Sequence, residues 1–238
     1  MDQTLQVSLA RSNLKGHLVQ MKQSHQNGQV KAINLLEDLI TIAKKSGADA
    51  ADAVFVEGVS LSKSIRMGKP EHLERSESCE IGLRVLIGKR QAMVSSSDTS
   101  REAMEELSMC ALAMAKAVPE DPFCGLAEIN QLATNFPDVQ SCDPFEPDAD
   151  HLSDLASRAE QAALAVDGIS NSEGASAGWG LNTVAMSASN GFSRAYANSS
   201  HSLSISVIAG EGTEMEGDYD YTAAVFAVDL ESPENLGE

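Results

Sequence analysis

The chain has 238 residues, of which 42% are hydrophobic, enough to bury the core of one large domain or two small ones. No apolar run reaches the roughly 18 residues that a membrane-spanning helix needs, so we expect no membrane partner. The net charge is −18, and residues 98–238 carry 4 Lys/Arg against 25 Asp/Glu, so this part of the chain repels phosphate backbones and we expect no nucleic-acid partner.

Residues 1–30 are polar and basic, with Arg11, Lys15 and Lys22 among Gln, Ser, His and Asn. We predict a flexible basic tail here, with a short helix left open as an alternative. The tail has no apolar central stretch of the kind found in signal peptides, so we expect a cytoplasmic protein. The four cysteines have neither zinc nor disulfide-motif spacing, and we expect reduced thiols: Cys79, Cys110, Cys124 and Cys142.

Residues 31–238 read as one α+β domain that begins with a helix over 31–46. Leu36, Leu39 and Ala43 lie on one stripe of this helix, and Gly47 can end it. Alternating apolar residues and turn signals then predict five strands. Their ranges are 51–57, 60–67, 71–76, 80–87 and 90–96.

Two more helices are predicted in the middle of the chain. The first follows the capping-box pattern Thr99-Ser100-Arg101-Glu102, ends before Pro119, and buries Leu107, Ala111 and Met114, with Cys110 as a core residue. Residues 119–147 hold five prolines and predict a long ordered connection. The next helix covers about 148–166, where Leu152, Ala156 and Ala163 line one face.

From Asn171 to Asp229 almost every residue fits a strand. Leu203, Ile205 and Val207 alternate with serines, which is typical of a sheet with one buried and one exposed face. Val184 and Met186 alternate in the same way with Ala185 and Ser187, and Asn190-Gly191 predicts a type I′ hairpin turn. The exposed face is rich in Ser and Ala, and it suits either water or an extended peptide.

The predicted fold class is therefore α+β, with antiparallel meander sheets packed against three helices in two helix-plus-meander units. Ser232-Pro233-Glu234 has the features of a further helix start, yet the sequence stops at Glu238. We expect residues 31–238 to be the N-terminal domain of a longer protein whose C-terminal domain is absent from this chain.

The sequence contains no complete catalytic or metal site. Ser176 lies in a Gly-x-Ser-x-Gly pattern, but strands follow it where a nucleophile elbow needs a helix. His201 shares a face with Leu203 and is interpreted as a core-edge residue. In the acidic run from Glu211 to Asp220, Gly212 and Gly217 are misplaced for a calcium loop, and no acid stands at the closing position. We predict no catalytic residue and no metal ligand.

The segment from Gly210 to Tyr221 is the best candidate for a binding rim. It joins two strong strand patterns and ends in Tyr219 and Tyr221, whose aromatic rings suit peptide binding without strict sequence choice. We predict Tyr219, Tyr221 and Asp218 as substrate-binding residues. The alternative is that both tyrosines pack against a further layer of the protein.

Several uncommon runs occur in an order that resembles the TldD/PmbA family, and more closely its PmbA (TldE) branch. These runs are Ser95–Asp98, Pro119–Ala127, Arg158–Ala162, Asn171–Gly174, Ser200–Ser204 and Gly217–Tyr221. The resemblance covers about residues 30–238, and the basic tail lies outside it.

The resemblance implies a protein about twice as long. It also implies pairing with a TldD subunit, a metalloprotease whose C-terminal half carries a His-Glu-x-x-x-His zinc motif that PmbA-type subunits lack. Such pairs enclose a chamber in which unfolded peptides bind as added strands. The family is linked to maturation of peptide antibiotics and to degradation of an antitoxin that acts on DNA gyrase. Zinc is expected only on the TldD-type partner, and no metal ligand of the family maps onto this chain.

Two functions follow as hypotheses. The chain is part of a PmbA-like subunit of a peptide-processing metalloprotease, non-catalytic by itself, with a TldD-like subunit or a second copy as partner. Alternatively, it is a non-catalytic adaptor that binds and modulates a protein, of the modulator of DNA gyrase type.

Overall fold

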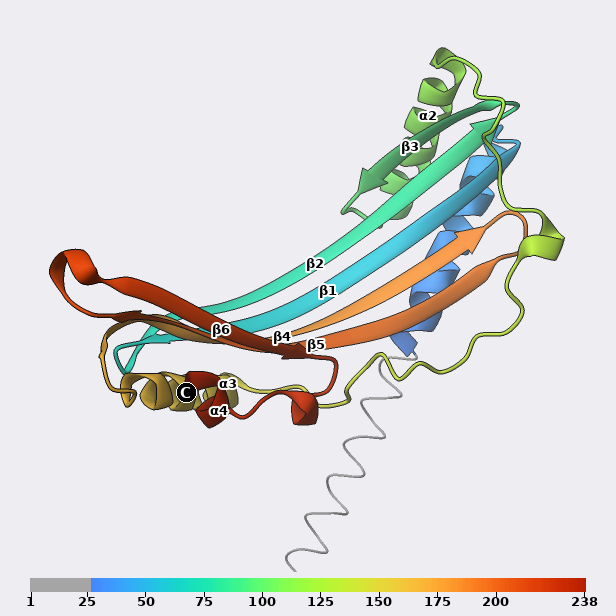
Figure 1. The fold of residues 1–238 in the computed structure, drawn as a ribbon. Coiled ribbons are helices and arrows are strands. Elements are labelled where there is room, and N and C mark those ends of the chain that lie inside the picture. Colours follow the sequence, from blue (N-terminus) through green and yellow to red (C-terminus); the bar gives the residue numbers. More distant parts are fainter. Residues whose placement is uncertain (1–26) are drawn as a thin grey trace, which may run out of the picture. The chain divides into compact units, whose positions relative to one another are not determined.

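The computed structural model describes residues 27–238, and within them the chain forms an antiparallel α+β structure (Figure 1). The six strands form one sheet in the order β3-β2-β1-β4-β5-β6, which confirms the predicted fold class. Residues 27–45 are helical. The other elements are β1 (Ala50–Arg66), β2 (Lys69–Ile87), β3 (Arg90–Ser96), α2 (Arg101–Ala117), α3 (Ala149–Leu164), β4 (Ile169–Ala188), β5 (Ser193–Ala209), β6 (Glu216–Ala224) and α4 (Pro233–Gly237), with single 3₁₀ turns at Ile129–Gln131, Gly212–Glu214 and Ala227–Asp229.

The strands are longer and fewer than the sequence predicted. The predicted strands 51–57 and 60–67 are both part of β1, and 71–76 and 80–87 are both part of β2. Gly58 continues the strand instead of ending it. The chain turns at Met67 and Gly68, whose φ angles of 49° and 70° fit the two left-handed positions of a type I′ turn.

The described residues form two compact units that alternate along the chain. Residues 27–57, 78–139 and 183–197 belong to the first unit, and residues 58–77, 140–182 and 198–238 to the second. The sequence analysis instead predicts two units that follow one another along the chain. The two units share four long strands. Each of β1, β2, β4 and β5 has one part in the first unit and one part in the second.

In the first unit, the helix over 27–45 and α2 bury apolar side chains against the sheet. Leu36, Leu39, Ile81 and Leu83 are at most 1% exposed. Ala185 and Ser187 also lie in this interior, whereas Met186 is 42% exposed, so the predicted orientation of this part of β4 is wrong. Small side chains on the buried face are what allow a helix to pack closely on a sheet, and alternation alone does not show which face that is.

The predicted buried stripe of α2 is displaced. Leu107 and Ala111 are buried as expected, but Cys110 and Met114 are exposed, and the buried stripe includes Met104 and Ser108 instead. From Leu107 to Ala115 the helix has no charged residue, so the periodicity of this part does not select one face. Ser100 caps the helix by accepting a hydrogen bond from Ala103 N at 3.3 Å.

In the second unit, α3 and α4 cover one face of the sheet. Leu152 of α3 packs into a core with Leu61, Trp179, Leu203 and Ile205. Ser202, Ser204 and Ser206 alternate with these buried residues on the opposite face, as predicted. The predicted helix start at Ser232 is confirmed, because Ser232 Oγ accepts from Asn235 N at the beginning of α4.

The turn between β4 and β5 differs from the prediction. Gly191 has a φ of 96°, but Asn190 is not among the non-glycine residues with positive φ, so this is not a type I′ turn. Gly191 N donates to Ala188 O at 3.0 Å, the pattern of a type I turn followed by a left-handed glycine. The Asn190 side chain holds this geometry by accepting from Phe192 N and donating to Ala127 O.

Most of the predicted tail, residues 1–26, lies outside the described residues; residues 27–30, also assigned to the tail, are helical. All four cysteines are free thiols, in agreement with the sequence analysis. Within residues 27–238 no helix combines the length and the hydropathy needed to cross a membrane.

Candidate functional site

Strand β6 forms one edge of the sheet and carries the predicted binding residues. In its antiparallel register with β5, Tyr219 lies opposite Ser206 and Tyr221 opposite Ser204. Residues directly opposite each other point to the same face. Both tyrosines therefore project from the serine-rich face that α3 and α4 leave uncovered. They are 73% and 68% exposed, so within residues 27–238 they do not pack against a further layer.

Asp218 belongs to the other face of β6. It pairs with Val207, whose side chain packs against the core beneath α3 and α4, and it lines a pocket of about 360 Å³ together with Asp220 and Leu236. The structure thus brings Tyr219 and Tyr221 together on one face and places Asp218 on the opposite one.

The carboxylates of Asp218 and Asp220 bind backbone amides of β6. Asp218 Oδ1 accepts from Tyr219 N at 2.9 Å, and Asp220 Oδ1 accepts from Tyr221 N at 2.7 Å. On an edge strand, alternate N–H groups point away from the sheet and form a template for another strand. The two carboxylates occupy this template at Tyr219 and Tyr221.

Beside the tyrosines, the uncovered face of the second unit is lined with small side chains. Ser64 Oγ and Ser176 Oγ form a hydrogen bond of 2.9 Å between β1 and β4. A Cβ atom at Gly178 would lie 2.9 Å from Ser202 Oγ, so the absence of a side chain at Gly178 leaves room for this serine rotamer. The result is a face with little relief, on which an extended backbone meets few steric obstacles.

The part of β2 in the second unit is more polar and more exposed than the edge formed by β6 and its tyrosines. Residues 69–77 of β2 are all exposed and are not among the residues that pair with β3. Arg75 pairs with Glu77 at 3.1 Å and with Glu146 at 3.6 Å, and Pro70 has no N–H to donate. Both edges carry charged side chains, but proline in β2 discourages strand addition and β6 presents two exposed aromatic rings, so β6 is the better candidate edge.

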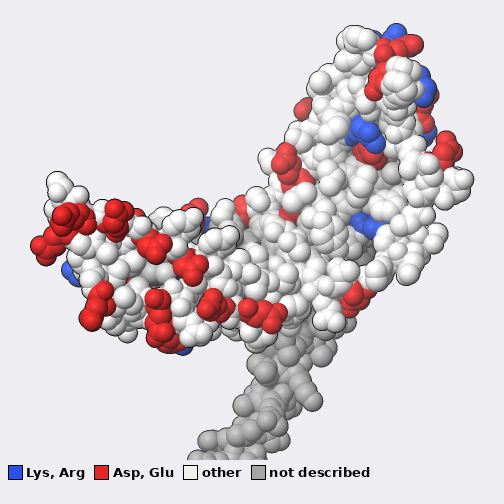
Figure 2. All heavy atoms as spheres, in the orientation of Figure 1, with Lys and Arg blue, Asp and Glu red and all other residues white. Residues whose placement is uncertain are grey.

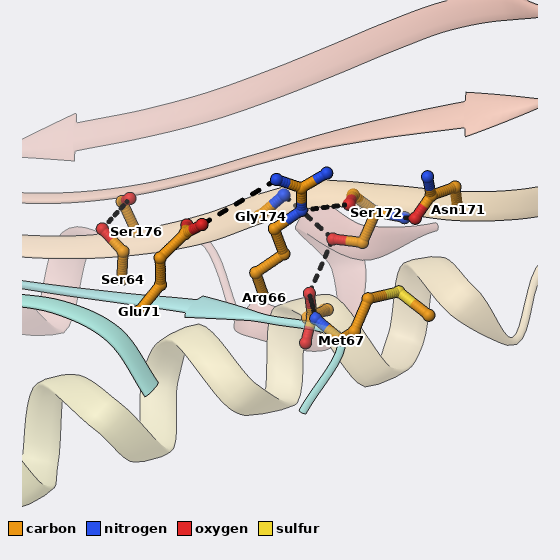
Figure 3. A network of polar contacts seen from close by, with 9 residues as sticks. Ser64, Arg66, Met67, Glu71, Asn171, Ser172, Gly174 and Ser176 are labelled. Carbon is orange, nitrogen blue, oxygen red and sulfur yellow. Dashed lines mark hydrogen bonds and ion pairs between the residues drawn. The ribbon is translucent and has the colours of Figure 1, made fainter. Parts of the chain in front are cut away.

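A buried carboxylate fixes the tip of the β1–β2 hairpin against α3. Glu160 is 1% exposed and accepts hydrogen bonds from Met67 N at 2.8 Å, Gly68 N at 2.7 Å and Ser172 Oγ at 2.6 Å. Figure 3 shows this network next to Arg66, which donates to Ser172 O and lies 3.8 Å from Glu71. The sequence analysis missed Glu160, although a Glu inside the alanine stripe of a predicted helix is a signal for a buried acceptor.

Gly174 gives β4 the shape that this network needs. Its φ is 123°, and a Cβ atom there would lie 3.2 Å from Ile65 O. Ser172 and Ala175 are both fully buried although they are three positions apart, so the alternation of the strand shifts at this glycine. The shift lets Ser172 reach Glu160 while Ala175 and Ala177 remain in the core.

The electrostatic character of the site is acidic. Figure 2 shows Asp and Glu side chains gathered over the region of β6, α3 and α4. The residues on and before β6 that carry this charge are exposed: Glu211, Glu214, Glu216, Asp218 and Asp220. A surface of this sign favours cationic segments over phosphate-bearing ligands.

The other two residues that the sequence analysis discusses, Ser176 and His201, both lie within strands of the second unit. Ser176 lies inside β4 with its hydroxyl bound to Ser64, and the strand–turn–helix context of a nucleophile is missing at this position. His201 is 3% exposed and packs on the core side of β5. Within the described part of the chain, no three His, Cys, Asp or Glu side chains are grouped closely enough to hold a metal ion.

Comparison with known proteins gives consistent matches along the chain. Residues 51–117 match the PmbA/TldA metallopeptidase domain 1, and residues 142–238 match the PmbA/TldA metallopeptidase central domain. Metalloprotease PmbA of Escherichia coli O157:H7 is 35% identical over 207 residues, which cover 85% of this chain and 46% of that protein. A PmbA homolog of Haemophilus influenzae is 36% identical over 201 residues, covering 84% of this chain and 44% of that protein.

Solved structures share the fold at lower identity. A protein named as a modulator of DNA gyrase from Bacteroides thetaiotaomicron has a TM-score of 0.77 at 21% identity, covering 86% of this chain and 47% of that one. TldE from Thermococcus kodakarensis has a TM-score of 0.71 at 16% identity, covering 85% and 45%. The chain spans about half the length of the relatives it matches.

Proposed function

Because the chain belongs to the PmbA/TldD metallopeptidase family, we propose that it is the N-terminal part of a PmbA-type subunit that holds extended peptides for a TldD-type metalloprotease. The zinc ion and the hydrolytic chemistry belong to the partner subunit. This chain contributes binding and orientation of the peptide backbone, and it has no catalytic residue of its own.

The observation that carries this proposal is the edge of β6. Strand addition combines backbone hydrogen bonds, which give affinity independent of sequence, with contacts to alternate side chains. Tyr219 and Tyr221 offer two exposed rings on the open serine-lined face, and their N–H groups point away from β5. A peptide that extends the sheet beside β6 lies across these rings.

For Asp218 we propose a role in covering the edge in the absence of a peptide. Its carboxylate holds the amide of Tyr219, so an added strand must displace it. Asp218 and Asp220 therefore act as a reversible cover for the edge, which protects β6 from unspecific pairing until a peptide competes for the two amides.

The experiment compares peptide affinity and assembly in the protein paired with a TldD-type subunit. The double variant Tyr219→Ala/Tyr221→Ala should weaken binding of an extended peptide by at least about 1 kcal/mol, roughly fivefold in Kd, by fluorescence anisotropy. Tyr196→Ala is the matched control, since Tyr196 is also exposed (55%) but lies on the part of β5 that belongs to the first unit.

The outcomes separate the two functions. Cleavage of an unstructured peptide only when both subunits are present, with normal assembly and weaker binding in the double variant, supports the proposal. Unchanged affinity per intact complex refutes the role of the tyrosines. Stable binding of one folded protein, with no cleavage of the peptide in any combination, favours the adaptor, the function that the name of the Bacteroides structure suggests.

A further inference from the structure

A pocket of about 360 Å³ lies beside β6 on the helix-covered face of the second unit, a volume in the range of ligand pockets. Asp218 and Asp220 of β6 line it, and both residues are exposed. The rest of the lining is largely apolar and includes Val166, Ile205, Val207 and Leu236. The pocket therefore combines an apolar floor with two carboxylates on its β6 side.

The register of β6 shows which residues of an added strand reach this pocket. Asp218 and Asp220 alternate with Tyr219 and Tyr221, so the aspartates face α3 and α4 while the tyrosines face away. The amides of the tyrosines point toward an added antiparallel strand, so the residues opposite the aspartates form non-hydrogen-bonded pairs, in which side chains lie closest. Every second side chain of the peptide therefore lies over the two aspartates and the pocket.

The two carboxylates have no cationic partner within residues 27–238, where neither forms an ion pair. Residues 198–238 contain nine Asp/Glu and no Lys or Arg. Arg158, the only Lys or Arg of α3, is already paired with Glu234 at 2.7 Å and with Asp154 at 3.3 Å. Positive charge beside these aspartates therefore has to come from the bound peptide.

We infer that the peptide held at β6 carries Lys or Arg at two alternate positions, opposite Asp218 and Asp220. The inference rests on the strand addition proposed above. The peptide carbonyls take the amides of Tyr219 and Tyr221, and the cations pair with the two carboxylates that this exchange releases.

Lys and Arg fit this pocket better than a small cation does. Their aliphatic stems pack on the apolar lining, and the charged group stays at the exposed carboxylates. The other face of the same peptide meets the tyrosine rings, which suit apolar or aromatic side chains. The preferred substrate is thus an extended segment that is basic on one face and apolar on the other.

The test uses labelled heptapeptides of Thr and Val that contain two lysines, on the assembly that tests the proposed function. In one peptide the lysines are two positions apart and share a face of the strand; in an isomer of the same composition they are adjacent and face opposite sides. The first peptide should bind at least about threefold more tightly, because it forms two cross-strand charge pairs and the isomer forms one. A peptide with glutamates in place of the lysines should bind more weakly than either.

A pair of charge variants tests the role of the two aspartates. Asp218→Asn/Asp220→Asn removes both charges, while each amide oxygen still accepts from the next backbone N–H, so the edge remains covered. The preference for alternating lysines should disappear in this variant. Glu211→Gln/Glu214→Gln removes the same charge from residues outside β6 and should leave the preference unchanged.

A second pair of variants tests the pocket itself. Val166 is 37% exposed, and Val166→Lys places a cation of the chain in the pocket, where it competes with the peptide and should abolish the preference. Val228→Lys is the matched control, because Val228 is 90% exposed and does not line this pocket.

Equal affinity for the two lysine isomers overturns the inference, and so does a preference that survives Asp218→Asn/Asp220→Asn. A neutral peptide of Thr and Val separates this failure from failure of the proposed function. If it slows hydrogen exchange at Tyr219 N and Tyr221 N while the isomers bind equally, strand addition stands and the charge selection is wrong. If no peptide slows exchange at these amides, both are wrong.

Discussion

The carboxylates of Asp218 and Asp220 bind the two backbone amides that the proposed strand addition would use, so removing them should open the edge of β6. The double change Asp218→Ala/Asp220→Ala leaves the tyrosines in place and frees both N–H groups. A peptide then binds without first displacing the two hydrogen bonds at 2.9 Å and 2.7 Å.

The size of the effect follows from these two bonds. A hydrogen bond within a protein contributes about 0.5–1.5 kcal/mol net, and solvent-exposed ones belong at the lower end. With about 0.5–1 kcal/mol for each amide, the competition amounts to about 1–2 kcal/mol. The double variant should therefore bind a neutral extended peptide roughly 5 to 30 times more tightly.

The assay is anisotropy of a labelled, uncharged peptide rich in Thr and Val, so that loss of two negative charges does not change long-range attraction. Glu211→Ala/Glu214→Ala is the control, since it removes the same charge from residues that lie outside β6. Size exclusion at the assay concentration checks that the opened edge has not caused self-association. An affinity that stays within twofold of the control, or falls below it, refutes the idea that the carboxylates guard the edge.

Four further outcomes are expected. Glu160→Ala removes an acceptor of three hydrogen bonds and should lower the free energy of unfolding by about 2–4 kcal/mol, measured by urea unfolding with tryptophan fluorescence. His201 has a pKa below its ordinary value of 6.5, so the unfolded chain binds more protons below that pH; thermal stability should fall from pH 7.5 to 5.5, and less so in His201→Leu. Gly237→Ala places a Cβ atom 2.5 Å from Ala159 O and should displace α4 from α3, lowering the melting temperature, whereas Gly125→Ala, with open space around it, should not. Elemental analysis after dialysis against a mild chelator should find no stoichiometric zinc in this chain.

Much of the fold follows from local patterns in the sequence. Ser232 caps α4 as its sequence context predicts, and the alternation from Ser202 to Val207 correctly separates the buried face of β5 from the exposed one. These features depend on a few neighbouring residues. The family resemblance added the correct expectation that the chain covers only part of the length of its relatives.

The predictions are wrong at positions whose burial depends on contacts between residues that are distant in the sequence. Cys110 and Met114 are exposed because the sheet contacts another stripe of α2, and the uncharged part of this helix from Leu107 to Ala115 offers several apolar stripes. Gly58 looked like a turn, yet pairing with neighbouring strands carries β1 through it. The strand pattern predicts an exposed Ala185, but this residue is buried against a helix more than 100 residues earlier in the chain.

The candidate site was predicted only in part. Tyr219 and Tyr221 were identified from their position between strand patterns, but the register with β5 was needed to show that Asp218 lies on the other face. The role of Glu160 depends on a turn at Met67, 93 residues away in the sequence, and on a shift in β4 that periodicity alone does not reveal. The periodicity of a sequence does not show which residues of different elements come into contact.

The most direct test of strand addition is hydrogen exchange at single amides of β6, followed by NMR with and without an extended peptide. If the peptide pairs with this edge, exchange at Tyr219 N and Tyr221 N slows markedly, because a peptide carbonyl replaces each exposed carboxylate, while amides on the 69–77 edge of β2 are unchanged. If the peptide binds and these two amides exchange as fast as before, β6 is not the site of addition and the proposed role of this edge is wrong.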